Sequence, residues 1–184
     1  MDRDLVERAM AGDHDAFSEL ARVTAGRLYA VARLILRDEA LAEDATQETL
    51  VAAWRHIRGL RHPDRFDAWL HQVLVRTCYR EARRHRPLGS LNVRIGSLEL
   101  SEPDRSIDLA DRDQLERGFA RLDVDQRSIL VLHYYIGLRL NEVGDVLGYP
   151  PGTVRSRLHR ATQAMRAALD ADARPGKVPG GRLA

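Results

Sequence analysis

Apolar residues recur every three or four positions in several stretches of this chain, and this spacing restricts its fold more than any other feature. The repeat is clearest between Phe17 and Ile35, where Leu20, Leu28 and Val31 share one side of a helix. An apolar stripe on one side of a helix requires a packing partner. Aromatic residues make up only 5% of the chain, and no strand is predicted. The sequence therefore predicts an all-α protein.

Two further helices are predicted in the N-terminal part of the chain. The first covers about residues 39–57 and the second about residues 67–85, each with an apolar stripe of its own. Between them, residues 58–65 contain Gly59 and Pro63, which interrupt helices. The N-terminal part is therefore expected to be a bundle of helices.

The character of the sequence changes at residues 87–112, which contain Pro, Gly and Ser and have no sustained period. A loop of this length is unusual inside a compact domain. We therefore predict two small helical domains, at 1–86 and 113–170, joined by a flexible linker at 87–112. The Pro- and Gly-rich residues 171–184 are expected to form a disordered tail.

Several classes of protein are excluded by composition and motifs. Cys78 is the single cysteine, which excludes a disulfide framework and a CxxC zinc site and fits the cytoplasm. No apolar run approaches the roughly 18 residues of a membrane span, so no membrane insertion is expected. The seven histidines lack the spacing of metal ligands, and no nucleotide-binding or catalytic motif is present. We expect no enzymatic activity, no metal and no cofactor.

The strongest functional pattern is a pair of helices predicted at about 140–147 and 153–169, separated by a turn that contains glycine and proline. A helix, a turn with glycine and a second helix form the motif that places the second helix in the DNA major groove. Gly144 fits a close crossing of the two helices. The predicted DNA-binding residues of the second helix are Arg155, Ser156, His159 and Arg160, with Arg157 on the flank. A solvated basic face on an ordinary helical hairpin is the alternative.

A second basic helix closes the predicted N-terminal domain. Its outward stripe contains Gln72, Arg76, Tyr79, Arg80 and Arg83. Arginines with an interleaved aromatic residue suit phosphate contact and base stacking. Arginines near a helix C-terminus also interact favourably with the helix dipole, so a merely solvated helix end remains an alternative.

A third pattern has the opposite charge. Residues 38–48 contain five acidic residues and no basic one, and Asp44, Gln47, Glu48 and Val51 line one face of the predicted helix. Acidic residues in a first helical turn are favourable by themselves. In a chain that binds DNA, an acidic face is also suited to a basic protein partner.

Three segments resemble the extracytoplasmic-function (ECF) sigma factors of bacterial RNA polymerase, a subfamily of the sigma-70 family. They are DEALAEDATQETLVAAW at 38–54, FDAWLHQVL at 66–74 and GLRLNEVGDVLGYPPGTVRSRLHRA at 137–161. The order of the three segments makes the resemblance specific, and it covers nearly all of residues 4–170 apart from the linker.

The resemblance implies a factor that binds core RNA polymerase and directs promoter-specific initiation of transcription. The face of Asp44, Gln47 and Glu48 would bind the clamp of the largest subunit, and the C-terminal domain would lie at the flap of the second subunit. The loop 58–66 and the helix 67–85 would recognise and open the −10 element. The helix 153–166 would read the −35 element. A cognate anti-sigma factor is a further partner that the resemblance implies.

Three features depart from the family pattern. One is the Pro150-Pro151 pair, which is stiffer than usual but compatible with the fold because Pro is tolerated at a helix start. Arg76 stands where members often have Asn, which affects the −10 base preference because Arg only donates hydrogen bonds. Arg139 stands where many members have Ser or Thr as a helix N-cap, so the helix is expected to start later, with Asn141 as its cap. A conventional helix-turn-helix regulator with an N-terminal effector or dimerisation domain is the alternative function. The absence of a visible dimer seam favours the sigma factor.

Overall fold

The structure is a computed structural model that describes residues 1–85 and 109–173. All regular elements among these residues are helical, as the sequence predicts. The N-terminal bundle is formed by the elements that precede residue 86, which are α1 (Arg3–Ala11), α2 (His14–Leu36), α3 (Glu39–His56), the 3₁₀ turns η1 (Ile57–Gly59) and η2 (Pro63–Arg65), and α4 (Phe66–Arg84). The C-terminal bundle is formed by α5 (Leu109–Ala120), α6 (Val124–Leu130), the π-helical segment η3 (Val131–Tyr135), α7 (Leu140–Leu147) and α8 (Pro151–Ala173).

Aspartate side chains cap the starts of four of the described helices, α1, α2, α3 and α6. Asp13 accepts hydrogen bonds from the backbone N–H groups of Asp15 and Ala16, and Asp38 accepts one from Leu41 at 2.9 Å. Asp123 and Gln126 form a capping box at the start of α6, with each side chain bonded to the backbone N–H of the other residue. These bonds satisfy N–H groups that have no partner inside the helix, so they fix where each helix begins.

Three expectations about element ends are wrong. The helix after Arg139 starts at Leu140 without a side-chain cap at Arg139, and the Glu142 carboxylate accepts a hydrogen bond from the backbone N–H of Arg139 at 2.8 Å. Helix α5 begins at Leu109, inside the predicted linker, of which the rest lies outside the described residues. Helix α8 continues to Ala173, past the predicted start of the tail at residue 171, and the remaining tail is also outside the described residues.

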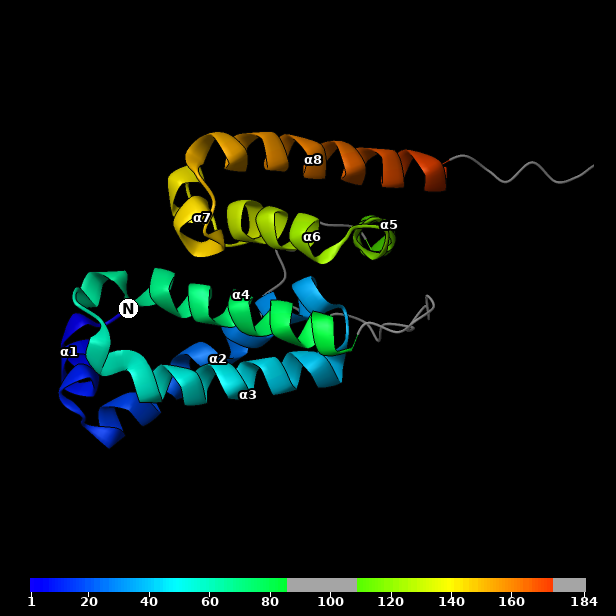
Figure 1. Ribbon diagram of the computed structural model, residues 1–184. Coiled ribbons are helices and arrows are strands. Elements are labelled where there is room, and N and C mark those ends of the chain that lie inside the picture. The colour runs from blue at the N-terminus through cyan, green and yellow to red at the C-terminus, as the bar shows by residue number, and fades with distance from the viewer. Residues whose placement is uncertain (86–108, 174–184) are drawn as a thin grey trace, which may run out of the picture.

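The two bundles are packed against each other. Figure 1 shows α4 between α2 and α3 on one side and α6 and α7 on the other, and both sides make contacts with it. The buried apolar residues form one continuous cluster that includes Leu28, Ile35 and Leu74 in the N-terminal bundle and Leu132 and Val143 in the C-terminal bundle. The sequence analysis predicted two tethered modules and did not predict this contact.

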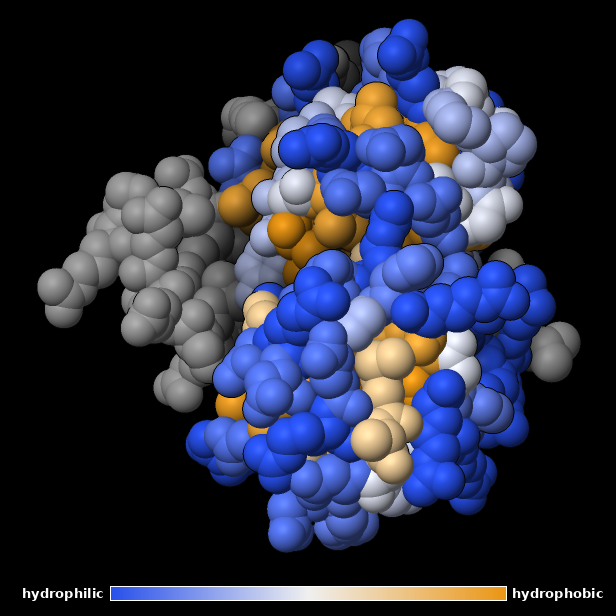
Figure 2. Space-filling view, turned by 90° about the vertical axis from the view of Figure 1, so that its left-hand side faces the viewer, coloured by the Kyte–Doolittle hydropathy of each residue, from blue (hydrophilic) through white to orange (hydrophobic). Residues whose placement is uncertain are grey.

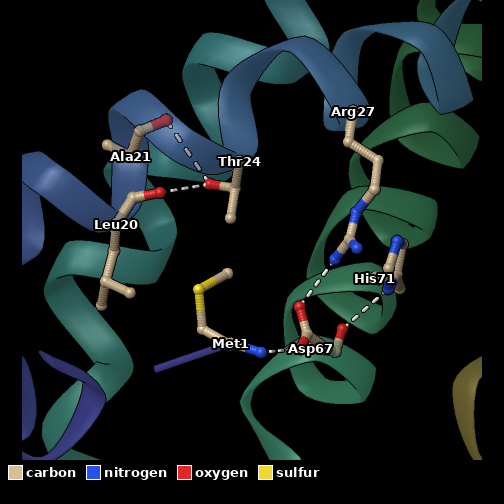
Figure 3. A network of polar contacts seen from close by, with 7 residues as sticks. All are labelled: Met1, Leu20, Ala21, Thr24, Arg27, Asp67 and His71. Carbon is tan, nitrogen blue, oxygen red and sulfur yellow. Dashed lines mark hydrogen bonds and ion pairs between the residues drawn. The ribbon is translucent and has the colours of Figure 1, made fainter. Parts of the chain in front are cut away.

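The start of α4 is fixed to α2 by a polar network (Figure 3). Asp67 pairs with Arg27 at 2.6 Å and with the N-terminal ammonium group of Met1 at 3.8 Å. One turn later, Nδ1 of the buried His71 lies 2.8 Å from the backbone carbonyl oxygen of Asp67. The Nε2 atom of His71 is buried and has no hydrogen-bond partner. Burial lowers the pKa of His71, and the nearby charge of Arg27 lowers it further.

This environment predicts a pH dependence of stability. Below its ordinary pKa of about 6.5, His71 takes up a proton in the unfolded chain but resists protonation in the folded one. The free energy of unfolding should therefore rise with pH between the lowered pKa and about 6.5. Urea unfolding of the wild-type protein and the His71→Gln variant at several pH values tests this prediction. An identical pH dependence of the two proteins would contradict it.

Gly144 allows α7 and α8 to approach closely, as the sequence predicts. A methyl group at this position would lie 2.8 Å from the carbonyl oxygen of Tyr149 and 3.2 Å from a methyl group of Val154. The backbone of the turn would have to move. The free-energy cost of this movement exceeds the stabilisation that the higher helix propensity of alanine would give.

The substitution Gly144→Ala is therefore expected to lower the free energy of unfolding by about 1–2 kcal/mol. Gly26→Ala is a matched control, because Gly26 lies within α2 and a methyl group there would meet no atom within 4 Å. It should raise stability by up to about 1 kcal/mol. Chemical denaturation of both variants measures the difference, and a stabilising Gly144→Ala would show that the crossing is not tight.

Candidate nucleic-acid and protein interfaces

Helix α8 has a buried face and an exposed basic face. Val154 and Ala161 are fully buried against the rest of the C-terminal bundle. Four of the five residues that the sequence assigned to DNA lie exposed on the other face, namely Arg155, Ser156, His159 and Arg160. A helix seated on a helix-turn-helix core with exposed arginines on its outer face has the geometry required for the major groove.

The fifth residue, Arg157, lies at the edge of this face. Its guanidinium carbon is 4.2 Å from the ring centroid of Tyr149, and its NH1 nitrogen is 3.7 Å from the carboxylate of Asp125. Both contacts connect α8 with other parts of the C-terminal bundle, and the side chain is half-buried. The structure therefore gives Arg157 partners outside α8, whereas the hydrogen bonds of Ser156, His159 and Arg160 stay within the helix.

Some polar side chains on the exposed face of α8 already form hydrogen bonds within the helix. The hydroxyl of Ser156 donates to the carbonyl oxygen of Thr153 at 3.0 Å, and a ring nitrogen of His159 lies 3.3 Å from the side-chain amide of Gln163. The oxygen of Ser156 can still accept a hydrogen bond, and Gln163 joins the predicted residues on the exposed face.

The basic stripe of α4 faces the C-terminal bundle. Arg76, Tyr79, Arg80 and Arg83 line a hollow of about 610 Å³, together with Arg84 of α4 and residues of α6, α7 and the turn before α8. Gln72, the first residue of the stripe, donates from its amide to the backbone carbonyl of Asp145 at 2.9 Å. The sequence analysis missed Arg84, whose position next to Arg83 gave no signal of its own.

Tyr79 and Cys78 are largely buried on α4. Burial raises the pKa of the Tyr79 hydroxyl, and the neighbouring carboxylate of Asp125 raises it further. This hydroxyl is buried without a hydrogen-bond partner of good geometry. Cys78 is fully enclosed, and burial raises the pKa of its thiol to about 12. A thiol in this state is unreactive at neutral pH.

The acidic face of α3 is exposed to solvent. Asp44 and Gln47 are exposed, and 48% of the adjacent Val51 is accessible. Glu48 is half-buried because its carboxylate pairs with Arg80 of α4 at 2.5 Å. Of the three residues predicted to bind a protein partner, Asp44 and Gln47 are thus directly available, and Glu48 also joins α3 to α4.

The described residues contain no group of three or more His, Cys, Asp or Glu side chains placed to hold a metal ion. Within residues 1–85 and 109–173, no helix is long and apolar enough to cross a membrane. The arrangement instead combines a helix-turn-helix with a second basic helix and an acidic exposed face. These features are those of a two-part helical DNA-binding protein.

Comparison with known proteins identifies the family. Residues 20–87 match the family model for sigma-70 region 2, and residues 118–167 match the model for sigma-70 region 4. The RNA polymerase sigma-H factor of Pseudomonas aeruginosa is 30% identical over 91% of this chain and 93% of its own length. The ECF RNA polymerase sigma factor SigM of Mycobacterium tuberculosis is 31% identical over 87% of this chain and 80% of its own length.

Solved structures give the same result. The chain is similar to CnrH, solved in complex with the cytosolic domain of CnrY, with 30% identity, a TM-score of 0.68 and coverage of 93% of this chain and 98% of that one. It is also similar to the sigma factor RpoE solved with the anti-sigma factor NepR from Bartonella quintana, with 25% identity, a TM-score of 0.60 and coverage of 85% and 98%.

The chain belongs to the ECF sigma factors of the sigma-70 family. It binds core RNA polymerase and DNA, directs the initiation of transcription, and is not an enzyme. The family membership confirms the resemblance that the sequence motifs indicate. It decides against the alternative of a conventional helix-turn-helix regulator with an effector or dimerisation domain.

Proposed function

We propose that three separate helix faces divide the work of initiation in this protein. The exposed face of α3 around Asp44, Gln47 and Glu48 binds the clamp of the largest polymerase subunit. The basic stripe of α4 and the loop 58–66 recognise and open the −10 element. The outer face of α8 reads the −35 element, and the C-terminal bundle lies at the flap of the second subunit. The distribution of one acidic face and two basic faces over different helices is the observation that carries this proposal.

The chemistry of α4 suits a melted strand. Arg76, Arg80 and Arg83 are exposed cations at helical spacing, which neutralise phosphates, and Tyr79 offers an aromatic face for stacking. The loop before α4 adds the exposed Arg58, and together these groups stabilise the opened strand more than the duplex. Because Arg76 only donates hydrogen bonds, it favours a base edge that presents acceptors.

An anti-sigma factor is a further proposed partner. One of the two solved structures described above is a sigma factor in complex with an anti-sigma factor, and the other is CnrH in complex with the cytosolic domain of CnrY; this chain aligns with 98% of each of the two solved chains. A partner of this type regulates initiation by covering the surfaces that contact DNA or polymerase. The proposed site of action is the cytoplasm, where the polymerase and the chromosome are found.

Transcription in vitro tests the proposal directly. The purified protein is added to core RNA polymerase with a library of genomic fragments, and the 5′ ends of the RNA are sequenced. We expect defined start sites that depend on the protein and share sequence elements near −10 and −35. RNA that starts at the same places with core polymerase alone would contradict the proposal.

A further inference from the structure

Helix α1 lies along the loop 58–66 that precedes α4, and its two ends contact the two ends of that loop. Figure 1 shows α1 beside the connection between α3 and α4, and α1 contacts both 3₁₀ turns of this connection, η1 and η2. At the N-terminal end of α1, Arg3 pairs with Asp64 of η2 at 3.4 Å. The ammonium group of Met1 lies 3.8 Å from the carboxylate of Asp67 in the first turn of α4. Charged groups therefore connect this end of α1 to the end of the loop.

The C-terminal end of α1 meets the start of the loop at Gly12. This glycine ends α1 with a φ of +98°, and its N–H donates to the backbone carbonyl oxygen of Ala9 at 3.0 Å. The next residue, Asp13, caps α2 and pairs with Arg8 of α1 at 2.6 Å. The turn between α1 and α2 is thus held on both sides, and its backbone forms a fixed surface next to the loop.

The guanidinium group of Arg58 packs directly on Gly12. A methyl group added to this glycine would lie 3.0 Å from Cζ of Arg58 and closer still to its NH2 nitrogen, so the guanidinium keeps its place only while the position has no side chain. Within residues 1–85 and 109–173, Arg58 forms no hydrogen bond or ion pair, and it is exposed. Its hydrogen-bond donors are therefore held at a defined place and are available to a ligand.

The surface around Arg58 suits a nucleic acid. The loop also carries the exposed Arg61 and Arg65, and Figure 2, which faces this end of the molecule, shows that most of the surface over the N-terminal bundle is hydrophilic. A phosphate attracts any nearby cation, including a mobile one, whereas a base edge is read only by donors in a defined position. A guanidinium group held on a glycine is therefore better suited to a base than to a phosphate.

We infer that Arg58 reads one base of the −10 element and that Gly12 is the positioning residue that holds it there. The inference rests on the function proposed for the loop 58–66, and it adds the contact that sets the base preference of this loop. A guanidinium group donates a pair of hydrogen bonds to two acceptors on one base edge, and guanine presents such a pair at N7 and O6. The base that Arg58 selects is therefore guanine.

A double-mutant cycle between the two residues tests the inference. Arg58→Ala removes the contact with the base, and Gly12→Asn adds a side chain that displaces the guanidinium group. The fold should tolerate Gly12→Asn, because the displaced group is the end of a flexible side chain and asparagine accepts a positive φ more readily than most residues. Gly137→Asn is the matched control for backbone strain, because Gly137 has a φ of +79° and a methyl group there would meet no atom within 4 Å.

Each variant is assembled with core polymerase, and the affinity of the holoenzyme is measured for promoter fragments from the start-site mapping with each −10 base pair varied in turn. Arg58→Ala and Gly12→Asn should each lower the affinity for the preferred sequence about tenfold and remove the preference for guanine at the same position. The double variant should lose no more than either single variant, because both act through one contact. The −35 preference and the affinity for core polymerase should be unchanged, and Gly137→Asn should keep the wild-type −10 preference.

Additive losses in the double variant, a uniform loss at all −10 positions, or an unchanged preference in a folded Gly12→Asn protein would each overturn the inference. Nuclear Overhauser contacts between the α-protons of Gly12 and the side chain of Arg58 test the packing in the wild-type protein, so the inference stays testable if Gly12→Asn does not fold. Absence of these contacts would also overturn it. A −10 preference that survives in Arg58→Ala refutes the role of Arg58 alone, whereas a wild-type holoenzyme without any −10 preference refutes the function proposed for the loop, and the inference with it.

Discussion

Replacement of Asp44 by arginine is expected to lower the affinity of the protein for core RNA polymerase about a hundredfold. The carboxylate is exposed on the outer face of α3, next to Gln47 and the exposed Val51, so a positive charge there would meet the basic partner that this face suits. The side chain does not contribute to the core, so helix content and melting temperature should be unchanged. Co-purification with tagged core polymerase and titration by fluorescence anisotropy measure the loss.

Glu48 is less suited to this test, although the sequence assigns it to the same face. Its carboxylate pairs with Arg80 at 2.5 Å, so a substitution there also disturbs α4 and the proposed −10 stripe. Asp170→Arg is the control for Asp44→Arg, because Asp170 is an exposed aspartate near the C-terminal end of α8. It should leave polymerase binding unchanged. Unaltered binding by a folded Asp44→Arg protein would show that α3 does not carry the clamp contact.

Local rules explain how much of the fold the sequence predicts. The starts of α2, α3 and α6 follow from Asp13, Asp38 and Asp123, because a capping side chain bonds to N–H groups only two or three residues away. The close crossing at Gly144 was also predictable from a motif of adjacent helices. The predicted start of the helix after Arg139 was wrong because the prediction considered only the residue at the cap position. It did not consider the glutamate three residues later, Glu142, which bonds to the backbone N–H of Arg139.

Long-range contacts explain what the sequence does not predict. The hydrogen bond from Arg127 to the carbonyl oxygen of Ile35 joins residues that are 92 positions apart in the sequence. The residues that flank Arg127 in the sequence do not distinguish it from an exposed arginine. The same applies to the position of Arg157, which depends on Tyr149 and Asp125. Helical periodicity assigns a residue to a face, but the face becomes an interface only when a distant element packs on it.

The difference between an outward helix face and a face that is free to bind a partner matters most on α4. The sequence predicts that the basic stripe of this helix points away from its own bundle and is therefore available to DNA. In the structure, the stripe is outward from its own bundle and faces the other one, with Gln72 already bonded to Asp145. The exposed face of α8 has no such cover among the described residues, so the two basic helices differ in availability although their sequences are similarly basic.

The availability of α8 leads to the second large expected effect. Arg155→Ala and Arg160→Ala should each weaken binding to the −35 element by about 1–3 kcal/mol, which is the contribution of a good contact between arginine and a base. Both side chains are exposed on the outer face, so the fold should tolerate their removal. Binding of the holoenzyme to promoter fragments with each −35 base pair varied in turn measures both affinity and sequence preference.

Arg157→Ala separates this role from a structural one within the same helix. Loss of its contacts with Tyr149 and Asp125 should lower the stability of the C-terminal bundle by about 0.5–1 kcal/mol, while the preferred −35 sequence is retained. Comparison of the three variants at equal fractions folded therefore assigns each arginine to DNA or to the protein. A changed base preference in Arg157→Ala, with none in Arg155→Ala or Arg160→Ala, would mean that α8 enters the groove by a different face, because these side chains differ in direction around one helix axis.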